Sequence, residues 1–301
     1  MSGASFGPIV VASCVDPGYL PFVEVVATSI AASADPTRQV EYHVIYDGPE
    51  NWLTRRLRAF RAGPVRVHLH VMANPWREFG TINGFPPSTL LRLSLEDALP
   101  DAIEKLIYLD VDLIVERDLG PLFDLPLRGH GLGAAIDGVA AGWLADPRRA
   151  DYHRYLRETL ELGDGASRYF QAGVLLLDLP TLRRTNYQRR MVDTLRRFGS
   201  RLLYVDQCAA NHVLKGDYES IDPRWNVQPL DMKSVPDPWI THYAGRKPWQ
   251  QLGIPGGSRW WKHARSLPTF PLFVWRLIRE RSRIELRNLR RRIERRLHPR
   301  R

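Results

Sequence analysis

The chain has 301 residues, of which 44% are hydrophobic and 25% are charged, a composition typical of a globular protein. Its two cysteines, Cys14 and Cys208, cannot form a disulfide framework, so we expect a reducing compartment such as the cytoplasm. We find neither a signal peptide nor an apolar run of about 18 residues, which argues against a secreted or membrane-spanning protein.

The first third of the chain alternates β-type runs with helical patterns. We predict strands over 9–13, 40–46 and 65–71, and helices over 23–34, 50–61 and from Ser88 to about Leu99. This order predicts an α/β protein with a doubly wound, mainly parallel sheet, whose ligands bind beyond the carboxyl ends of the strands. We interpret His68 and His70, in the third strand, as surface residues rather than ligands.

A buried central strand is predicted over 106–115, where Asp110 and Asp112 interrupt an apolar run. Residues i and i+2 of a strand point to the same side, so these two carboxylates can converge. Their repulsion is relieved by a shared divalent cation, and oxygen ligands suit Mg²⁺ or Mn²⁺. The alternative interpretation is an ordinary turn after a strand, where aspartate is common.

The second half continues with a looser pattern. We predict strands over 133–137, 173–177, 202–205 and 240–245, and helices over 146–162, 182–198 and 206–214, the last capped by Asp206.

Four segments, in chain order, resemble the motifs of glycosyltransferase family 8: Tyr-Leu-Asp-Val-Asp at 108–112, Tyr-Phe-Gln-Ala-Gly-Val at 169–174, Asp-Gln and Asn211 at 206–211, and His-Tyr-Ala-Gly-Arg-Lys-Pro-Trp at 242–249. This family includes bacterial lipopolysaccharide galactosyl- and glucosyltransferases. The resemblance implies a GT-A fold over 1–267, a UDP-sugar donor, Mn²⁺ or Mg²⁺, and transfer of galactose or glucose, with retention, to a saccharide or glycolipid.

The same resemblance implies the residues around the metal and the diphosphate. Asp110, Asp112 and His242 would be the metal ligands, although His242 alone would more simply be a core histidine. Lys247 would contact the diphosphate, and Gly245 would let the backbone approach it. The spacing from Gly245 to Lys247 is one residue shorter than in the family pattern, so the lysine is expected to reach the phosphates differently.

At the nucleoside end, the resemblance implies a uridine site formed by Cys14, Val15, Asp16 and Tyr19, with Tyr19 stacked on the base. Asp16 could equally be a plain turn residue. Three further donor contacts are implied at Arg92, which could instead be a surface arginine, and at Val111 and Ala172.

At the sugar end, the resemblance implies contacts from Asp137, Gln171, Asp206 and Gln207. Gln171 replaces the asparagine common in the family, which adds a methylene and could alter recognition of sugar hydroxyls. Asp206 would bind hydroxyls of the donor sugar, and Gln207 would lie near the anomeric carbon. Because an amide is a poor nucleophile, a front-side mechanism is favoured over a covalent intermediate.

The C-terminal segment, 268–301, is predicted to be a basic amphipathic helix. The chain's net charge of +10 is concentrated here, because residues 276–301 hold twelve arginines and three glutamates. Apolar residues recur near helical spacing at Ile278, Leu286, Leu289, Ile293 and Leu297. The pattern favours peripheral binding to an anionic membrane, on its cytoplasmic face, over a solvated or nucleic-acid-binding tail.

Two other functions remain open from the sequence. A sugar nucleotidyltransferase would need a glycine-rich phosphate loop near the first strand, and residues 13–19 contain none. A non-catalytic nucleotide-sugar or nucleic-acid-binding protein would have no need for all of Asp110, Asp112 and His242.

Overall fold

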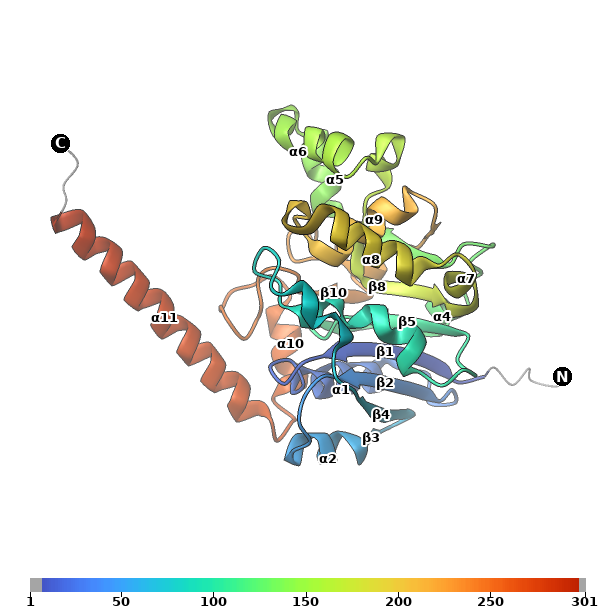
Figure 1. The fold of residues 1–301 in the computed structure, drawn as a ribbon. Helices are drawn as coiled ribbons and strands as arrows, with labels where there is room; N and C mark the ends of the chain where they lie inside the picture. The colour runs from blue at the N-terminus through green and yellow to red at the C-terminus, as the bar shows by residue number, and fades with distance from the viewer. Residues whose placement is uncertain (1–6, 298–301) are drawn as a thin grey trace.

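A mixed eight-stranded sheet organises the structure, a computed structural model that describes residues 7–297, with side chains described as far as Arg283 (Figure 1). Its strands are β1 Ile9–Val15, β2 Val40–Tyr46, β3 Arg61–Ala62, β4 Val65–Val71, β5 Lys105–Leu109, β7 Leu132–Ile136, β8 Phe170–Asp178 and β9 Glu219–Ser220. They lie in the order β3-β4-β2-β1-β5-β8-β7-β9. Strands β4, β2, β1 and β5 are parallel neighbours, whereas β8 is antiparallel to β5 and β7. The predicted α/β class with a mainly parallel sheet is confirmed.

Helices cover both faces of this sheet (Figure 1). Alternate residues of β1 show the division: Val11 packs into the cluster that contains α1, and Ala12 into the cluster that contains α8 and α9. The helices are α1 Phe22–Ser33, α2 Trp52–Arg58, α3 Leu95–Ala98, α4 Gly120–Phe123, α5 Gly138–Ala145, α6 Ala150–Arg154, α7 Leu179–Arg184, α8 Tyr187–Phe198, α9 Val205–Leu214, α10 Gly257–Ala264 and α11 Phe270–Leu297.

The single strand predicted over 106–115 is wrong, because the chain changes sheets within it. Strand β5 ends at Leu109, and β6, Leu113–Val115, pairs antiparallel with β10, Ile240–His242, in a separate two-stranded sheet. Asp110 and Asp112 therefore lie in the turn between two strands. Val111, in this turn, is itself buried, so the apolar run shows no break where the sheet changes.

Several predicted helices are shorter or more broken than expected. Asn51 caps α2 by accepting hydrogen bonds from two backbone N–H groups, so the helix starts at Trp52. The helix predicted over 182–198 is divided into α7 and α8 at Asn186, whose φ is +53°. Within the predicted helices 88–99 and 146–162, parts are replaced by 3₁₀ turns at Pro87–Ser94 and Pro147–Arg149 and by a π turn at Tyr155–Thr159. Other 3₁₀ turns, outside the predicted helices, lie at Pro75–Phe79, Gly163–Arg168, Gly199–Arg201 and Pro223–Asn226.

The strand predicted over 202–205 is also wrong. The backbone N–H of Leu203 donates to the hydroxyl of Tyr155 rather than to a neighbouring strand, and α9 begins at Val205. Tyr204 occupies the N-cap position, so Asp206 lies inside the first helical turn and is not the cap. Its carboxylate is thereby left to pair with another side chain.

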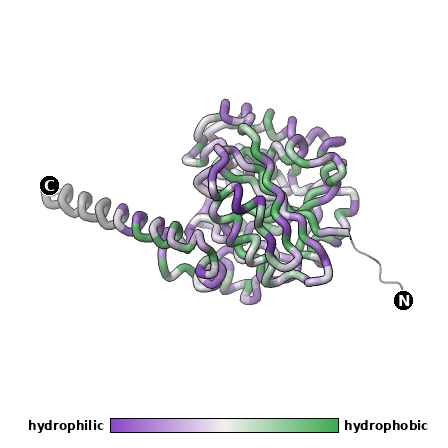
Figure 2. The backbone as a smooth tube through the Cα atoms, turned by 90° about the horizontal axis from the view of Figure 1, so that it is seen from below, coloured by the Kyte–Doolittle hydropathy of each residue, from purple (hydrophilic) through white to green (hydrophobic). Residues whose placement is uncertain are grey.

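Helix α11 extends away from the body of the protein as a single arm in both views (Figures 1 and 2). Phe273, in its first turn, is buried and packs against Phe22 and Trp260, with ring centroids 5.1 Å apart in each pair. Trp275 and Ile278 are more than half exposed. Of the apolar positions predicted along this helix, those after Arg283 have side chains outside the described residues.

Candidate active site

Asp110, Asp112 and His242 come together at the carboxyl end of β5. Each offers one ligand atom, and these atoms lie within 4.8 Å of one another. His242 Nε2 is 3.2 Å from Asp112 Oδ1 and 3.7 Å from Asp110 Oδ2. The pairing of β10 with β6, which sets His242 opposite Leu113, delivers the imidazole to the aspartate turn. Two carboxylates and one imidazole form a ligand set that fits a divalent cation.

Two neighbouring residues hold the His242 ring in this position. Its Nδ1 is 3.0 Å from Asn226 Oδ1, so an Nδ1–H donated to the amide leaves the Nε2 lone pair directed at the carboxylates. On the other side, a Cβ on Gly173 would lie 2.1 Å from His242 Cε1, so only glycine fits there. Asn226 was not predicted from the sequence.

Lys247 forms an ion pair with Asp112, through Nζ and Oδ2. Burial opposes ionisation of Asp112, but Lys247 and His242 outweigh it and hold the pKa of this carboxyl well below its usual range. Gly245, just before the lysine, has φ +80°, a conformation that glycine adopts without strain. The lysine therefore reaches the aspartate pair despite the shortened spacing.

Arg92 connects the aspartate pair to the helix α9. Its guanidinium donates to Asp110 Oδ1 at 2.7 Å and to the carbonyl of Ala172 at 2.8 Å, and lies 3.0 Å from Asp206 Oδ2. The structure thus rules out the surface-arginine interpretation. Burial raises the pKa of Asp206 to about 6, against the opposing effect of Arg92.

A chain of buried polar groups continues from Asp206 to Asp137. Gln207 Nε2 donates to Asp137 Oδ2 at 2.9 Å, and Gln207 Oε1 lies 3.3 Å from the backbone N–H of Ala172. Gln228 Nε2 also donates to Asp137, at 3.2 Å. The structure therefore brings the predicted Asp137, Gln207 and Asp206 to one region, and adds Gln228.

Gln171 lies at the boundary between this polar chain and the aspartate pair. Its Oε1 accepts from the N–H of Gly173 at 2.5 Å and from Asn226 Nδ2 at 2.8 Å. Two residues of this site were missed from the sequence: Asn226, which ends a 3₁₀ turn, and Gln228, two positions later. Both are buried polar residues beside the buried Trp225 and Val227, and no local sequence pattern identifies them.

The predicted nucleoside residues lie at the end of β1 and in the turn that follows it. Asp16 accepts from the N–H of Tyr19 at 3.0 Å and from Ser88 Oγ at 2.7 Å, so it organises the turn, as one of the two interpretations expected. Val15 is buried at the strand end, and burial raises the pKa of the Cys14 thiol, which remains protonated at neutral pH.

Comparisons with known proteins find one matching family model and several similar proteins. The model of a family described as Glycosyl transferase family 8 matches residues 10–253. General stress protein A of Bacillus subtilis (strain 168) is 24% identical over 261 residues, which cover 79% of this chain and 86% of that protein. The lipopolysaccharide 1,3-galactosyltransferase of Salmonella typhimurium is 21% identical over 254 residues, 77% of this chain and 71% of that enzyme.

Solved structures give the same result for the fold. The galactosyltransferase LgtC, crystallised with donor and acceptor sugar analogues, aligns with a TM-score of 0.72 and 25% identity, over 87% of this chain and 97% of that structure. The GT-A fold expected from the sequence is thereby confirmed.

Proposed function

Because this chain belongs to glycosyl transferase family 8, we propose that it is a retaining, metal-dependent hexosyltransferase. The proposed donor is a UDP-sugar that carries galactose or glucose, and the acceptor is a hydroxyl group of a saccharide or glycolipid. The observation that carries this proposal is the meeting of Asp110, Asp112 and His242 beside Lys247. The galactosyltransferase names of the Salmonella relative and of LgtC support it.

Asp110, Asp112 and His242 would hold Mn²⁺ or Mg²⁺. Such an ion, when bound, supplies Lewis-acid stabilisation of the negative charge that develops on the departing diphosphate. Lys247 now balances the charge of Asp112. When the metal ion and the donor are bound, the metal ion would neutralise Asp112. We then expect the Lys247 ammonium to leave this carboxylate and to pair with diphosphate oxygens.

The nucleoside would lie against the turn that follows β1. Tyr19 would stack on the uracil, and Asp16 would accept a hydrogen bond from the uracil or the ribose. Val111 and Ala172 would complete the donor contacts, and Gly245 would let the backbone approach the diphosphate.

For the transfer itself we propose front-side attack. The bond between the anomeric carbon and the diphosphate oxygen breaks, and the acceptor oxygen forms its bond on the same face. The acceptor proton passes to the departing phosphate oxygen. Asp206 would accept hydrogen bonds from the donor sugar, and Gln207, held by Asp137, would lie beside the anomeric carbon.

The test is UDP release from UDP-galactose and UDP-glucose, with and without Mn²⁺. We expect metal-dependent release in the wild type, and its loss in the double variant Asp110→Asn/Asp112→Asn. Equal turnover by wild type and variant would overturn the metal role. A thermal-shift panel of UDP-sugars identifies the donor, because a bound ligand raises the melting temperature.

The described part of α11 supports the proposed membrane contact. Leu272, Trp275 and Ile278 are exposed and are interleaved with arginines at 276, 279, 281 and 283. Within residues 7–297, no helix is both long and apolar enough to cross a membrane. We therefore propose that α11 lies on an anionic surface, the cytoplasmic face of a membrane, where each cation contributes about 1 kcal/mol.

The start of α11 is joined to the nucleoside turn, since Arg276 donates to the carbonyl of Gly18 at 2.6 Å and lies over the Phe22 ring at 5.0 Å. A helix on the membrane would thus hold the active site close to lipid-linked acceptors.

Truncation after Arg283 keeps the contact of Arg276 with Gly18 and removes eight arginines. We expect loss of binding to vesicles that contain anionic lipid, and unchanged UDP release. Vesicle binding equal to that of the full chain would overturn the membrane proposal.

A further inference from the structure

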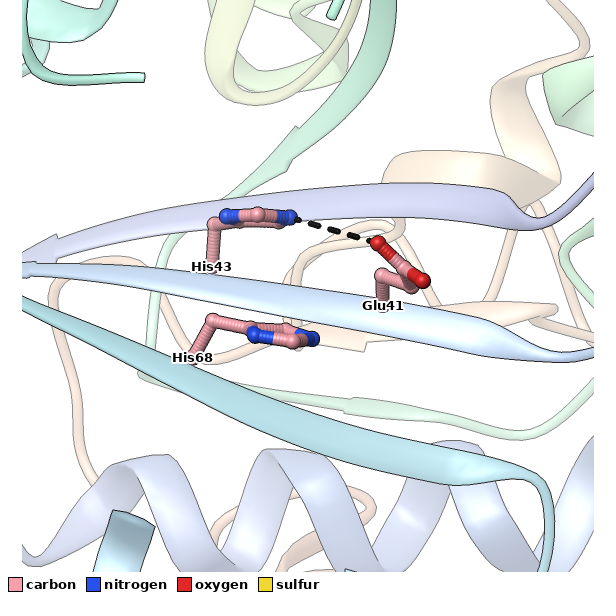
Figure 3. Close-up of side chains that lie close together, drawn as sticks. All are labelled: Glu41, His43 and His68. Atoms are coloured by element: carbon pink, nitrogen blue, oxygen red, sulfur yellow. Dashed lines mark ion pairs between the residues drawn. The ribbon is translucent and has the colours of Figure 1, made fainter. Parts of the chain in front are cut away.

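A second cluster of ligand-type side chains lies on the sheet itself, on β2 and β4. Glu41 and His43, at positions i and i+2 of β2, project from the same face. The parallel register sets His68 of β4 directly beside His43. Figure 3 shows the two imidazole rings lying side by side, with the Glu41 carboxylate directed at His43. One ligand atom from each of the three lies within 4.8 Å of the others.

The two imidazoles leave a nitrogen each without a partner. His43 Nε2 and His68 Nε2 are both buried, and neither makes a hydrogen bond with the described residues. His43 is only 4% exposed, so its nitrogen cannot turn to bulk water. An unpaired buried nitrogen costs free energy, and two of them next to each other indicate a missing ligand. The closest charged atom to His43 Nε2 is Glu41 Oε2, at 3.8 Å.

His70 prepares His43 to act as a ligand. His43 Nδ1 lies 2.9 Å from His70 Nε2, and donation of the Nδ1 proton to His70 leaves the Nε2 lone pair free.

Simple stacking does not account for this arrangement. The rings of His43 and His68 are nearly parallel, 16° apart with centroids separated by 4.8 Å, as a stacked pair would be. Stacking, however, leaves both Nε2 atoms unsatisfied and gives no role to the converging carboxylate. A cation satisfies all three groups together once the two rings turn about their Cβ–Cγ bonds, because the Nε2 lone pairs of parallel rings do not meet at one point.

We propose that Glu41, His43 and His68 bind one zinc ion, which joins β2 to β4. Two imidazoles and one carboxylate are a ligand set that zinc accepts, with water in the fourth position. Bonds of about 2.0–2.1 Å to zinc place tetrahedral ligand atoms about 3.3 Å apart. The 3.8 Å separation of Glu41 Oε2 from His43 Nε2 closes to that value by a small movement of Glu41, a partly exposed side chain.

The zinc ion would strengthen a weak edge of the sheet. Beyond β4 the sheet is continued only by β3, which is two residues long. A bond between the side chains of β2 and β4 holds the outermost full-length strand in register. Zinc that binds the folded chain raises its melting temperature, whether or not the protein transfers sugars.

The test is zinc titration of the chelator-treated full-length protein, followed by calorimetry and thermal unfolding. Wild type should bind one zinc with an affinity that falls at least tenfold in Glu41→Gln and in His68→Asn, and its melting temperature should rise with zinc. Asp112→Asn should keep this binding step, which separates it from the aspartate site. The matched histidine control is His130→Asn, because His130 lies on a surface loop and its side chain pairs with Asp217.

Glu41→Gln decides the question, because a partly exposed side chain can be changed without disturbing the core. Unchanged zinc affinity in both variants would overturn the proposal, as would an equal loss in His130→Asn or a binding step that disappears in Asp112→Asn.

Discussion

Two three-residue clusters in this protein each have ligand atoms within 4.8 Å of one another, but their surroundings differ. The first, Asp110, Asp112 and His242, is rich in carboxylates and is bounded by two cations, Lys247 and Arg92. The second, Glu41, His43 and His68, is rich in imidazoles. In the described part of the chain, no lysine or arginine pairs with its carboxylate.

The difference shows what each cluster is suited to bind. A carboxylate pair that already holds a lysine and an arginine remains compatible with an anionic ligand, because the cations can be shared with it. Two imidazoles and a single carboxylate match a softer ion that needs no further anion. The positions of the two clusters in the sheet support this difference in ligands. The first cluster follows the carboxyl end of a strand, where ligands of such sheets bind, and the second lies along two strands.

The largest effect should come from Asp112→Asn. Removal of this carboxylate removes both a metal ligand and the partner of Lys247, so we expect kcat/KM for UDP release to fall about 1000-fold, equivalent to about 4 kcal/mol. The measurement is Mn²⁺-dependent UDP release. Asp151→Asn, whose side chain is 99% exposed, is the matched control and should retain wild-type activity. Activity within tenfold of wild type would mean that the first cluster is not the metal site.

Gly173→Ala tests how closely the first cluster is packed. The added Cβ would meet the His242 ring at 2.1 Å, so the ring must move, and we expect about a 100-fold loss of activity together with destabilisation of about 1–3 kcal/mol. Gly142→Ala is the control, because nothing lies within 4 Å of its Cβ and alanine favours helix α5. Denaturant unfolding and UDP release measure both. Wild-type activity in Gly173→Ala would contradict the placement of His242.

The sequence predicts the two clusters to different extents. Asp110 and Asp112 stand out in the sequence, because carboxylates are rare in so apolar a run. The change of sheet between them cannot be predicted, because the apolar Val111 makes the run look continuous. His68 was interpreted as a surface residue, and the structure corrects this, since its Nε2 is buried. The alternation of 65–71 gives the face of each side chain, but only the register with β2 sets His68 beside His43.

Residues that act from distant segments are hardest to predict. Asn226 orients His242 from a 3₁₀ turn, and no local pattern connects an asparagine there to a histidine sixteen residues later. Arg92 belongs to another 3₁₀ turn, and its role came from family resemblance rather than from its neighbours. Such contacts arise from the packing of whole elements.

The positioning residues of the two clusters should give smaller, parallel losses. Asn226→Ala removes the partner of His242 Nδ1, and His70→Asn removes that of His43 Nδ1. We expect about a 30-fold loss of Mn²⁺ affinity in the first variant and of Zn²⁺ affinity in the second, within the range for such outer partners. Calorimetry with each ion measures both. A variant that lowered the affinities for Mn²⁺ and Zn²⁺ equally would indicate a general loss of structure and would contradict the existence of two separate sites.

The smallest effect concerns pH and arises at Asp206, which Arg92 connects to the first cluster. Burial, assisted by Asp110 and opposed by Arg92, raises the pKa of Asp206 from 3.8 to about 6. If the carboxylate binds the donor sugar, kcat/KM should fall about tenfold from pH 7 to pH 5, as protonation removes the acceptor. Asp206→Asn should be less active and should lack this acid limb. The measurement is a pH profile of UDP release by both proteins.

The same raised pKa predicts how stability changes with pH. The folded state binds the Asp206 proton more tightly than the unfolded state does, so this residue stabilises the fold below pH 3.8 and loses that contribution as the pH rises through about 6. The free energy of unfolding of wild type, relative to Asp206→Asn, should therefore decrease between pH 4 and pH 7. An increase over this range would mean that Arg92 outweighs burial and that Asp206 is ionised throughout, which would also remove the acid limb expected for the reaction.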